Sequence, residues 1–246
     1  MGQQQVAIVT GGSSGIGLET GLRLVKRGYR LGVIDMVDRP ADTPLPADVA
    51  WAVADVSRED QVDAAVATIH DELGATDLLV NNAGITGSLE GASKCHESSA
   101  DEWDKVMGVN VRGIFLAARA VLPGMLERGS GHIITVASAA GVAAFPGRCA
   151  YTTSKGAALM FAKSLAADYA AVGIRSNAIC PGYVHTPMTD WRLQDDELRA
   201  ALEAKIPIGR VAQPGEIADA ICAMADTDFA YLNGHALLLD GGWTAV

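Results

Sequence analysis

The chain has 246 residues, a formal net charge of -10 at pH 7 and a hydrophobic content of 49%. A chain this long and apolar can bury a full core, so intrinsic disorder is excluded and one domain spanning residues 1–246 is expected. Because the charge balance is acidic and basic residues form only short runs, nucleic acid is not expected as a partner.

The cysteines and the N-terminus bear on metal binding and on the cellular compartment. The cysteines have no CxxC spacing and no histidine at the offsets typical of zinc sites, so we expect no metal centre. The N-terminus lacks the charged and apolar regions of a signal peptide. No apolar stretch reaches the roughly 20 residues of a membrane span. We therefore expect a cytoplasmic protein with no membrane partner.

Short β-branched runs alternate with longer helical stretches along the chain. Strands are predicted at residues 6–9, 30–34, 49–54, 78–80, 133–136, 174–179 and 236–239. Helices are predicted from the first turn to Gly28, at 58–73, 100–128 and 151–171, near 195–204, and at 214–225. This alternation predicts an α/β fold of the Rossmann-like type, in which a doubly wound parallel sheet of about seven strands is flanked by helices.

The first predicted strand ends in a glycine-rich turn, TGGSSGIG, whose glycines form a GxxxGxG pattern at the start of a helix. Glycines let the backbone turn tightly and approach a pyrophosphate, whose charge is stabilised at a helix N-terminus. The turn therefore predicts a dinucleotide site, although such a motif taken alone is also compatible with a structural turn. The predicted cofactor contacts in the turn are Gly11, Ser13, Ser14, Gly15, Ile16 and Gly17.

Asp35 ends the second predicted strand and is the candidate determinant of cofactor type. A carboxylate at this place can accept hydrogen bonds from both hydroxyls of an adenosine ribose and would repel a 2′-phosphate. Neither Met36, which follows it, nor Ser14 supplies a cation for such a phosphate. We therefore predict NAD rather than NADP. The alternative is that Asp35 only caps a helix or loop.

Tyr151 and Lys155 lie four residues apart on a predicted helix, so they share one face, and Ser138 follows a predicted strand. A free tyrosine has a pKa near 10, which a nearby ammonium and a positive nicotinamide ring would lower. Tyr151 would then accept the proton of an alcohol, while Ser138 holds the substrate oxygen and Lys155 the cofactor ribose. Taken alone, a YxxxK spacing is also a common chance pair on a surface helix.

Together with NNAG at 81–84, Asn110 in VNVRG and Pro-Gly at 181–182, these motifs resemble the short-chain dehydrogenase/reductase family along the whole chain. The resemblance implies a catalytic tetrad of Asn110, Ser138, Tyr151 and Lys155, in which Asn110 orders a proton-relay water. It also implies a homotetramer. Beyond the turn, Asp35 and the tetrad residues Tyr151 and Lys155, the implied cofactor contacts are Asp55, Val56, Asn82, Ala83, Gly84, Pro181, Gly182, Val184 and Thr186.

A narrower resemblance links the segments at 109–116, 144–157, 186–193 and 240–246 to the 2-hydroxypropyl-coenzyme M dehydrogenases, and most closely to the R-selective type. It implies that Arg148 and Arg192 grip a substrate sulfonate. Two guanidiniums can clamp an anionic tail through bidentate hydrogen bonds, which would fix the face of a ketone that meets the hydride. Alternatively, Arg192 pairs with the acidic residues at 195–197, and Arg148 is a surface residue or an intersubunit contact.

We therefore expect an NAD-dependent oxidoreductase that interconverts a secondary alcohol and a ketone, with 2-hydroxypropyl-coenzyme M or another substrate with an anionic tail. The segment at 184–208 is expected to close over the substrate as a lid. The predicted substrate contacts are Ser138, Arg148, Tyr151, Met188, Trp191 and Arg192. The alternatives are a neutral aryl or aliphatic ketone, a 3-oxoacyl or cis-diol substrate, and a non-catalytic NAD-binding protein, against which the intact tetrad argues.

Overall fold

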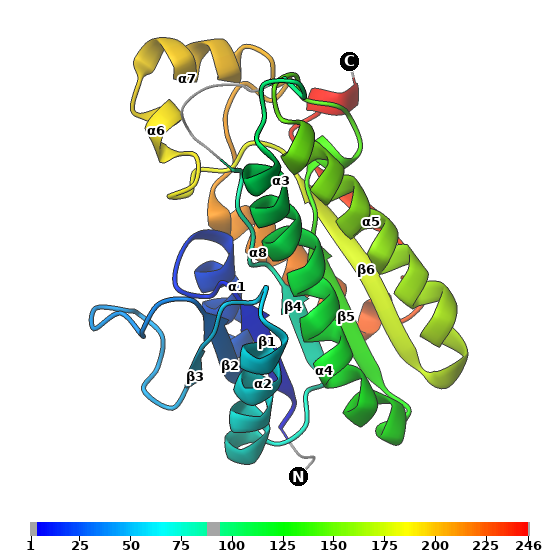
Figure 1. Cartoon of the computed structure of the whole chain (residues 1–246). Coiled ribbons are helices and arrows are strands. Elements are labelled where there is room, and N and C mark those ends of the chain that lie inside the picture. The colour runs from blue at the N-terminus through cyan, green and yellow to red at the C-terminus, as the bar shows by residue number, and fades with distance from the viewer. Residues whose placement is uncertain (1–3, 88–93, 246) are drawn as a thin grey trace.

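The computed structural model describes residues 4–87 and 94–245, and in this part of the chain seven strands pair in one parallel sheet (Figure 1). The spatial order is β3-β2-β1-β4-β5-β6-β7. Because the order reverses between β1 and β4, a crevice is expected at the carboxyl ends of these two strands. The strands are β1 (Val6–Thr10), β2 (Arg30–Asp35), β3 (Ala50–Val53), β4 (Leu78–Asn81), β5 (Gly131–Val136), β6 (Ile174–Pro181) and β7 (Ala236–Leu239).

Helices cover both faces of the sheet, which explains why the central strands read as continuous apolar runs. One face carries α2 (Glu59–Leu73), α4 (Gly113–Arg128) and α5 (Cys149–Tyr169), and the other carries α1 (Gly15–Lys26) and α8 (Pro214–Ala225) (Figure 1). Neighbouring residues of β1 pack on opposite faces of the sheet. Ile8 packs in the core cluster of α2 and α4, and Val9 packs in that of α1 and α8. The predicted single α/β domain with a doubly wound sheet is confirmed.

One long helical stretch runs through α3 (Ala100–Met107), a π-helical turn (Gly108–Arg112) and α4. By length and composition alone it could cross a membrane, so the expectation that no stretch reaches that length was wrong. Half of its most apolar window is nevertheless buried inside the protein, and Leu116 and Val121 lie in the core. The stretch is therefore used as a core helix of the α/β domain.

The segment between β6 and α8 leaves the sheet and contains two short helices, α6 (Asp190–Leu193) and α7 (Asp196–Glu203). Only the second of these was predicted as a helix. The segment has its own small apolar cluster, made of Leu193, Leu202, Ile206 and Val211. Figure 1 shows α6 and α7 beyond the end of the sheet where β6 finishes, so the segment lies over the carboxyl ends of the strands.

Candidate active site

A cavity of about 340 Å³ opens at the carboxyl ends of β1, β2, β4, β5 and β6. It brings together residues that are far apart in the sequence, as the fold predicts for this crevice. Sequence-predicted residues that line it are Gly11, Ser13, Ser14, Gly15, Ile16, Asp35, Asp55, Val56, Asn82, Ala83, Gly84, Ser138, Tyr151, Lys155, Pro181, Gly182, Val184, Thr186 and Met188. The predicted residues Gly17, Asn110, Arg148, Trp191 and Arg192 do not line it.

The glycine-rich turn is shaped by close approaches of the backbone to its neighbours. Gly11 has φ +68°, and a Cβ there would lie 2.9 Å from Cα of Ala83. Gly15 has φ +54°, and a Cβ there would lie 3.3 Å from Cγ2 of Thr186. A Cβ on Gly17 would clash with the Gly11 carbonyl oxygen, so this third glycine has a packing role beneath the turn. The turn therefore leaves its outer side open to the cavity.

Hydrogen bonds join the end of β1 to the end of β4 at the floor of the cavity. The Thr10 hydroxyl oxygen accepts from the backbone N–H groups of Asn82 (3.0 Å) and Ala83 (3.1 Å). The Asn82 amide donates to the carbonyl oxygens of Thr10 (3.0 Å) and Gly11 (2.8 Å). Because the Asn82 amide is used inside the protein, it holds the glycine-rich turn in place and presents backbone to the cavity.

Asp35 is held at the cavity edge by the turn itself. Its Oδ2 accepts the backbone N–H of Ser13 at 2.9 Å, and its Oδ1 accepts that of Val37 at 3.3 Å. The nearby Arg39 donates to four backbone carbonyls of the loop after β2, those of residues 45, 46, 47 and 49. The Arg39 guanidinium therefore binds the carbonyl groups of its own loop. The residue that follows Asp35 in the cavity wall is Met36, whose side chain is exposed.

Tyr151 and Ser138 form a hydrogen-bonded pair on the cavity wall. Burial raises the pKa of Tyr151, while the hydrogen bond with Ser138 and the positive charge of Arg148 act in the opposite direction. The expected lowering of this pKa by an ammonium together with a positive nicotinamide ring stays a prediction for the protein with its cofactor. The Ser138 oxygen also accepts the backbone N–H of Ala140 at 3.1 Å, which fixes the hydroxyl at the end of β5.

Lys155 is 6% exposed, and its Nζ donates to the carbonyl oxygen of Val136 at 2.8 Å. Burial lowers the pKa of Lys155 to about 8. Nζ lies 5.8 Å from the ring centre of Tyr151, one helical turn away. A Cβ on Gly84 would lie 3.4 Å from Nζ, so the glycine of the NNAG motif leaves room for this ammonium. A buried amine is thereby held beside the phenol.

Asn110 lies in the π-helical turn and is 1% exposed. Its amide nitrogen donates to the Ile85 carbonyl oxygen (2.8 Å) and to Ser154 Oγ (2.9 Å), and its oxygen accepts the Ile85 N–H (2.8 Å). Ser154 in turn donates to the Tyr151 carbonyl oxygen at 2.7 Å. The side chain of Asn110 therefore ties the chain after β4 to the helix that carries Tyr151. Its role in ordering a relay water stays a prediction.

The two predicted arginines lie beside the cavity. Arg148 immediately precedes α5, three residues before Tyr151. Arg192 belongs to α6. Its backbone N–H donates to the carbonyl oxygen of Thr189, a residue that lines the cavity. Burial lowers the pKa of Arg148, and the charge of Arg192 lowers it further, so the two guanidiniums act on each other. They belong to segments that are far apart in the sequence.

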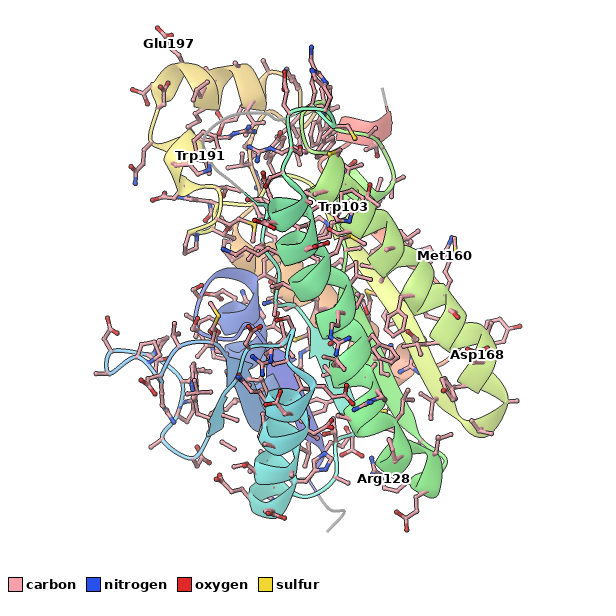
Figure 2. All side chains as sticks on the ribbon, viewed as in Figure 1. Trp103, Arg128, Met160, Asp168, Trp191 and Glu197 are labelled. Carbon is pink, nitrogen blue, oxygen red and sulfur yellow. The ribbon has the colours of Figure 1, made fainter. Side chains whose placement is uncertain are left out.

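The alternative roles for Arg192 can be compared with the contacts of α6 and α7. Its guanidinium carbon lies 4.7 Å from the ring centre of Trp191, whereas Asp195 accepts the N–H groups of Glu197 and Leu198 as the cap of α7. Figure 2 shows Trp191 on α6, in the segment beyond the sheet. The Trp191 ring therefore packs against the Arg192 guanidinium. Trp191 and Met188 were both predicted to form the cavity wall, but only Met188 lines the cavity.

Comparison with known proteins agrees with this arrangement. The chain matches the family described as enoyl-(acyl carrier protein) reductase over residues 11–244. It is 49% identical to 2-(R)-hydroxypropyl-CoM dehydrogenase of Xanthobacter autotrophicus, over 98% of this chain and 99% of that protein. The chain belongs to the short-chain dehydrogenase/reductase family. It is therefore an oxidoreductase of a family that uses a nicotinamide cofactor.

Solved structures of short-chain dehydrogenases share the fold. Levodione reductase is 34% identical with a TM-score of 0.90, and the match covers 98% of each chain. A variant of actinorhodin polyketide ketoreductase, solved with NADPH, is 32% identical with a TM-score of 0.91, covering 99% of this chain and 98% of that one. A neighbour solved with NADPH has the same fold, so the fold alone does not distinguish NAD from NADP.

Several residues that line the cavity were not predicted from the sequence. Most are apolar residues that flank a motif, and strand periodicity could have indicated those at strand ends. Thr189 is different, because its hydroxyl donates to the Val184 carbonyl oxygen at 2.5 Å and closes a turn that the sequence pattern did not reveal. The missed lining residues are Ile34, Met36, Ala54, Ile85, Val109, Val136, Ala137, Pro187 and Thr189.

Proposed function

We propose that this protein is an NAD-dependent dehydrogenase that interconverts a secondary alcohol and a ketone whose other end carries an anionic tail, with 2-hydroxypropyl-coenzyme M as the leading substrate. The observation that carries the proposal is the pair of guanidiniums, Arg148 and Arg192, at the side of a cavity that contains Tyr151. An alcohol near Tyr151 and a sulfonate near the arginines would use both features at once.

The cavity residues fit a nicotinamide dinucleotide. The glycine-rich turn leaves backbone exposed at the N-terminus of α1, where a pyrophosphate is favoured. Asp35 offers carboxylate oxygens at the end of β2 to ribose hydroxyls, and the nearby Arg39 is committed to backbone carbonyls. Among the described residues that line the cavity, Lys155 is the sole Lys or Arg, and it lies at the end of the cavity with Tyr151. These features favour NAD over NADP.

The chain's own residues supply proton transfer and orientation. A nicotinamide cofactor bound in the cavity supplies or accepts the hydride. Ser138 holds the substrate oxygen, and Tyr151 Oη takes the alcohol proton during oxidation or returns it during ketone reduction. Burial raises the pKa of Tyr151, and the charge of Arg148 acts in the opposite direction. The ammonium of Lys155 and a positive nicotinamide ring would further favour the phenolate during the reaction.

The arginine pair gives the substrate an orientation. A sulfonate offers three oxygen acceptors, and two guanidiniums can bind it through several charge-assisted hydrogen bonds. Burial is the main cause of the lowered pKa of Arg148, the charge of Arg192 adds to it, and the carboxylate of Glu102 acts in the opposite direction. A bound anion would offset the contribution of Arg192. With the tail held there, one face of the carbonyl carbon is presented to the cofactor. The segment at 184–208, which carries Arg192, would act as the lid.

We further propose that the protein works in the cytoplasm as a homotetramer. Large apolar side chains are exposed on the outer helices, such as Phe115 on α4 (46% exposed) and Met160 on α5 (59% exposed). Figure 2 shows Met160 pointing outward from α5. Such side chains on one helical layer suit burial against further copies of the chain.

A direct assay tests the proposed activity. The initial rate of reduced cofactor formation, NADH from NAD or NADPH from NADP, is measured with R- and S-2-hydroxypropyl-coenzyme M and with the neutral alcohol 2-butanol. We expect one hydroxypropyl-coenzyme M isomer with NAD to give the highest kcat/KM. Equal values for this substrate and 2-butanol would contradict the anionic-tail assignment, and equal use of NADP would contradict the assignment of NAD.

A further inference from the structure

Three aromatic rings from distant parts of the chain meet next to the arginine pair. Phe145 comes from the loop between β5 and α5, Tyr183 follows β6, and Trp243 lies in the C-terminal 3-10 turn (Trp243–Ala245). The ring centre of Trp243 is 4.4 Å from that of Phe145 and 4.7 Å from that of Tyr183. Centroid distances near this range are typical of stabilising aromatic contacts. We refer to these three residues as the aromatic cluster.

Trp243 is held by a turn that is itself well fixed. Asp240 accepts the backbone N–H groups of Gly242 (2.9 Å) and Thr244 (2.9 Å) and the Thr244 hydroxyl (2.6 Å). The Gly182 N–H donates to the Leu239 carbonyl oxygen at 3.0 Å, which joins the end of β7 to the cavity wall. Figure 1 places the C-terminus at the same end of the molecule as α6 and α7. Trp243 is therefore a rigid part of this end.

Tyr183 connects the aromatic cluster to the base of the segment that carries Arg192. Its ring packs against the small apolar cluster of that segment. Its carbonyl oxygen accepts the Ala212 N–H at 3.0 Å, and the His185 N–H donates to the Ala212 carbonyl oxygen at 2.9 Å, which closes the two ends of the segment. A ring that contacts Tyr183 therefore contacts the place where the two ends of the segment are joined.

Phe145 connects the aromatic cluster to Arg148. Only two residues, the second of them Gly147 with φ +70°, separate Phe145 from Arg148, which begins the helix of Tyr151. Tyr183 also acts electrostatically on Arg148. Trp243 thus contacts one ring on each of the two segments that supply the arginines, but it does not itself line the cavity.

From this arrangement we propose that Trp243 is a positioning residue that sets the spacing of Arg148 and Arg192 and thereby the preference for an anionic substrate tail. The inference rests on the proposed function, because it assigns a residue to the tail-binding part of that site. Trp243 acts through Phe145 on one arginine and through Tyr183 on the other. Its removal lets the two segments shift independently, while Tyr151 and Lys155 stay fixed on α5 and Ser138 stays fixed just after β5.

The test compares two ketones that differ only in a terminal sulfonate or a neutral group of similar size. The holoenzyme is assayed as wild type, Trp243→Ala, Trp243→Phe and Phe229→Ala. Phe229→Ala is the control, because Phe229 is, like Trp243, an aromatic residue in a one-turn 3-10 helix, but it is more exposed and lies outside the aromatic cluster. NADH affinity and the melting temperature are measured for each variant.

From the loss of two aromatic contacts, we expect Trp243→Ala to raise KM for the sulfonate ketone by roughly tenfold. The kcat for both ketones and the KM for the neutral one should stay within about twofold of wild type. Trp243→Phe should restore most of the preference, and the Phe229 control should retain all of it. If Trp243→Ala does not fold, Phe145→Leu removes the opposite ring of the same contact and carries the same expectation.

Two outcomes overturn the inference by itself. One is an unchanged sulfonate preference in Trp243→Ala, and the other is an equal loss for both ketones, which would mark Trp243 as a merely structural residue. A different outcome overturns the proposed function as well: wild-type protein that shows no preference for the sulfonate. The failure of the inference and the failure of the function are therefore distinguishable within one experiment.

Discussion

The proposed cofactor side of the cavity is formed by the ends of adjacent strands, whereas the proposed substrate side is formed by segments that leave the sheet. On the cofactor side, Thr10 and Asn82 join neighbouring strands through short hydrogen bonds. On the substrate side, Arg148 and Arg192 are placed by a loop and by a short helix with its own small apolar cluster. A fixed reaction centre is thus combined with a recognition site that can change without disturbing the sheet.

The two regions should consequently respond to mutation in different ways. Changes at the reaction centre should lower kcat for every substrate, because all substrates share the same proton and hydride transfer. Changes among the outlying segments should alter KM for some substrates only. The predictions below test this division, beginning with the largest expected effect.

Tyr151→Phe removes the proposed proton donor and acceptor and leaves the ring in place. Positioned acid–base groups contribute up to about 10⁴-fold to rates, so kcat should fall by roughly 10³-fold or more for anionic and neutral ketones alike. NADH affinity, measured by fluorescence titration, should change little. The control is Tyr169→Phe at the other end of α5, which should keep full activity. Retention of more than about a tenth of kcat would contradict the assignment.

Lys155 makes the reaction centre sensitive to pH in the protein without ligands. Its usual pKa of 10.5 is lowered to about 8 by burial, so between these values the unfolded chain binds more protons than the folded one. The cost of burying the ammonium is therefore present below pH 8 and relieved as pH rises toward 10.5.

The free energy of unfolding of the wild-type protein, compared with that of Lys155→Met, should rise by about 3 kcal/mol between pH 8 and pH 10.5. Chemical denaturation at several pH values measures the difference. Lys163→Met, at an exposed position of the same helix, is the control for loss of a lysine charge. A wild-type-to-Lys155→Met difference that stays constant from pH 8 to 10.5 would show that the ammonium is not buried as described.

Asp35→Ser tests the adenosine end of the cofactor side. Loss of the carboxylate removes both the acceptor for ribose hydroxyls and the repulsion of a 2′-phosphate. The ratio of kcat/KM for NAD to that for NADP should fall by roughly 30-fold, in line with the worth of one or two hydrogen bonds to a charged group. Asp38→Ser, an exposed position in the following loop, should leave the ratio unchanged. An unchanged ratio in Asp35→Ser would remove Asp35 from cofactor selection.

The same division explains what could be predicted from the sequence. The fold followed from strand and helix periodicity. The glycine-rich turn and Asp35 followed from their places at strand ends, whereas the other expected cofactor contacts followed from the family resemblance. Gly17 was placed at the cofactor because motif spacing does not distinguish a glycine that faces a ligand from one that allows close packing. The sequence did not reveal that burial raises the pKa of Tyr151 in the protein without cofactor, because burial is a property of the assembled core.

The substrate side was harder to predict because it depends on contacts between distant segments. Helix α6 was missed, since four residues are too few to show a helical period. The contact of Trp243 with Phe145 and Tyr183 joins three regions whose sequences show no sign of their proximity. Ser154 is a hydroxyl in the middle of a helix, and only the structure reveals that it joins Asn110 to the Tyr151 backbone.

In the proposed function, Arg148 and Arg192 recognise an anionic tail independently of the reaction centre. The most direct test measures kcat/KM for the sulfonate ketone and its neutral counterpart in wild type, Arg148→Ala and Arg192→Ala, with Arg199→Ala on α7 as control. Each active-site variant should lose roughly 10- to 100-fold with the sulfonate, mainly in KM, and less than about threefold with the neutral ketone. Equal losses with both ketones in the two active-site variants would contradict the account.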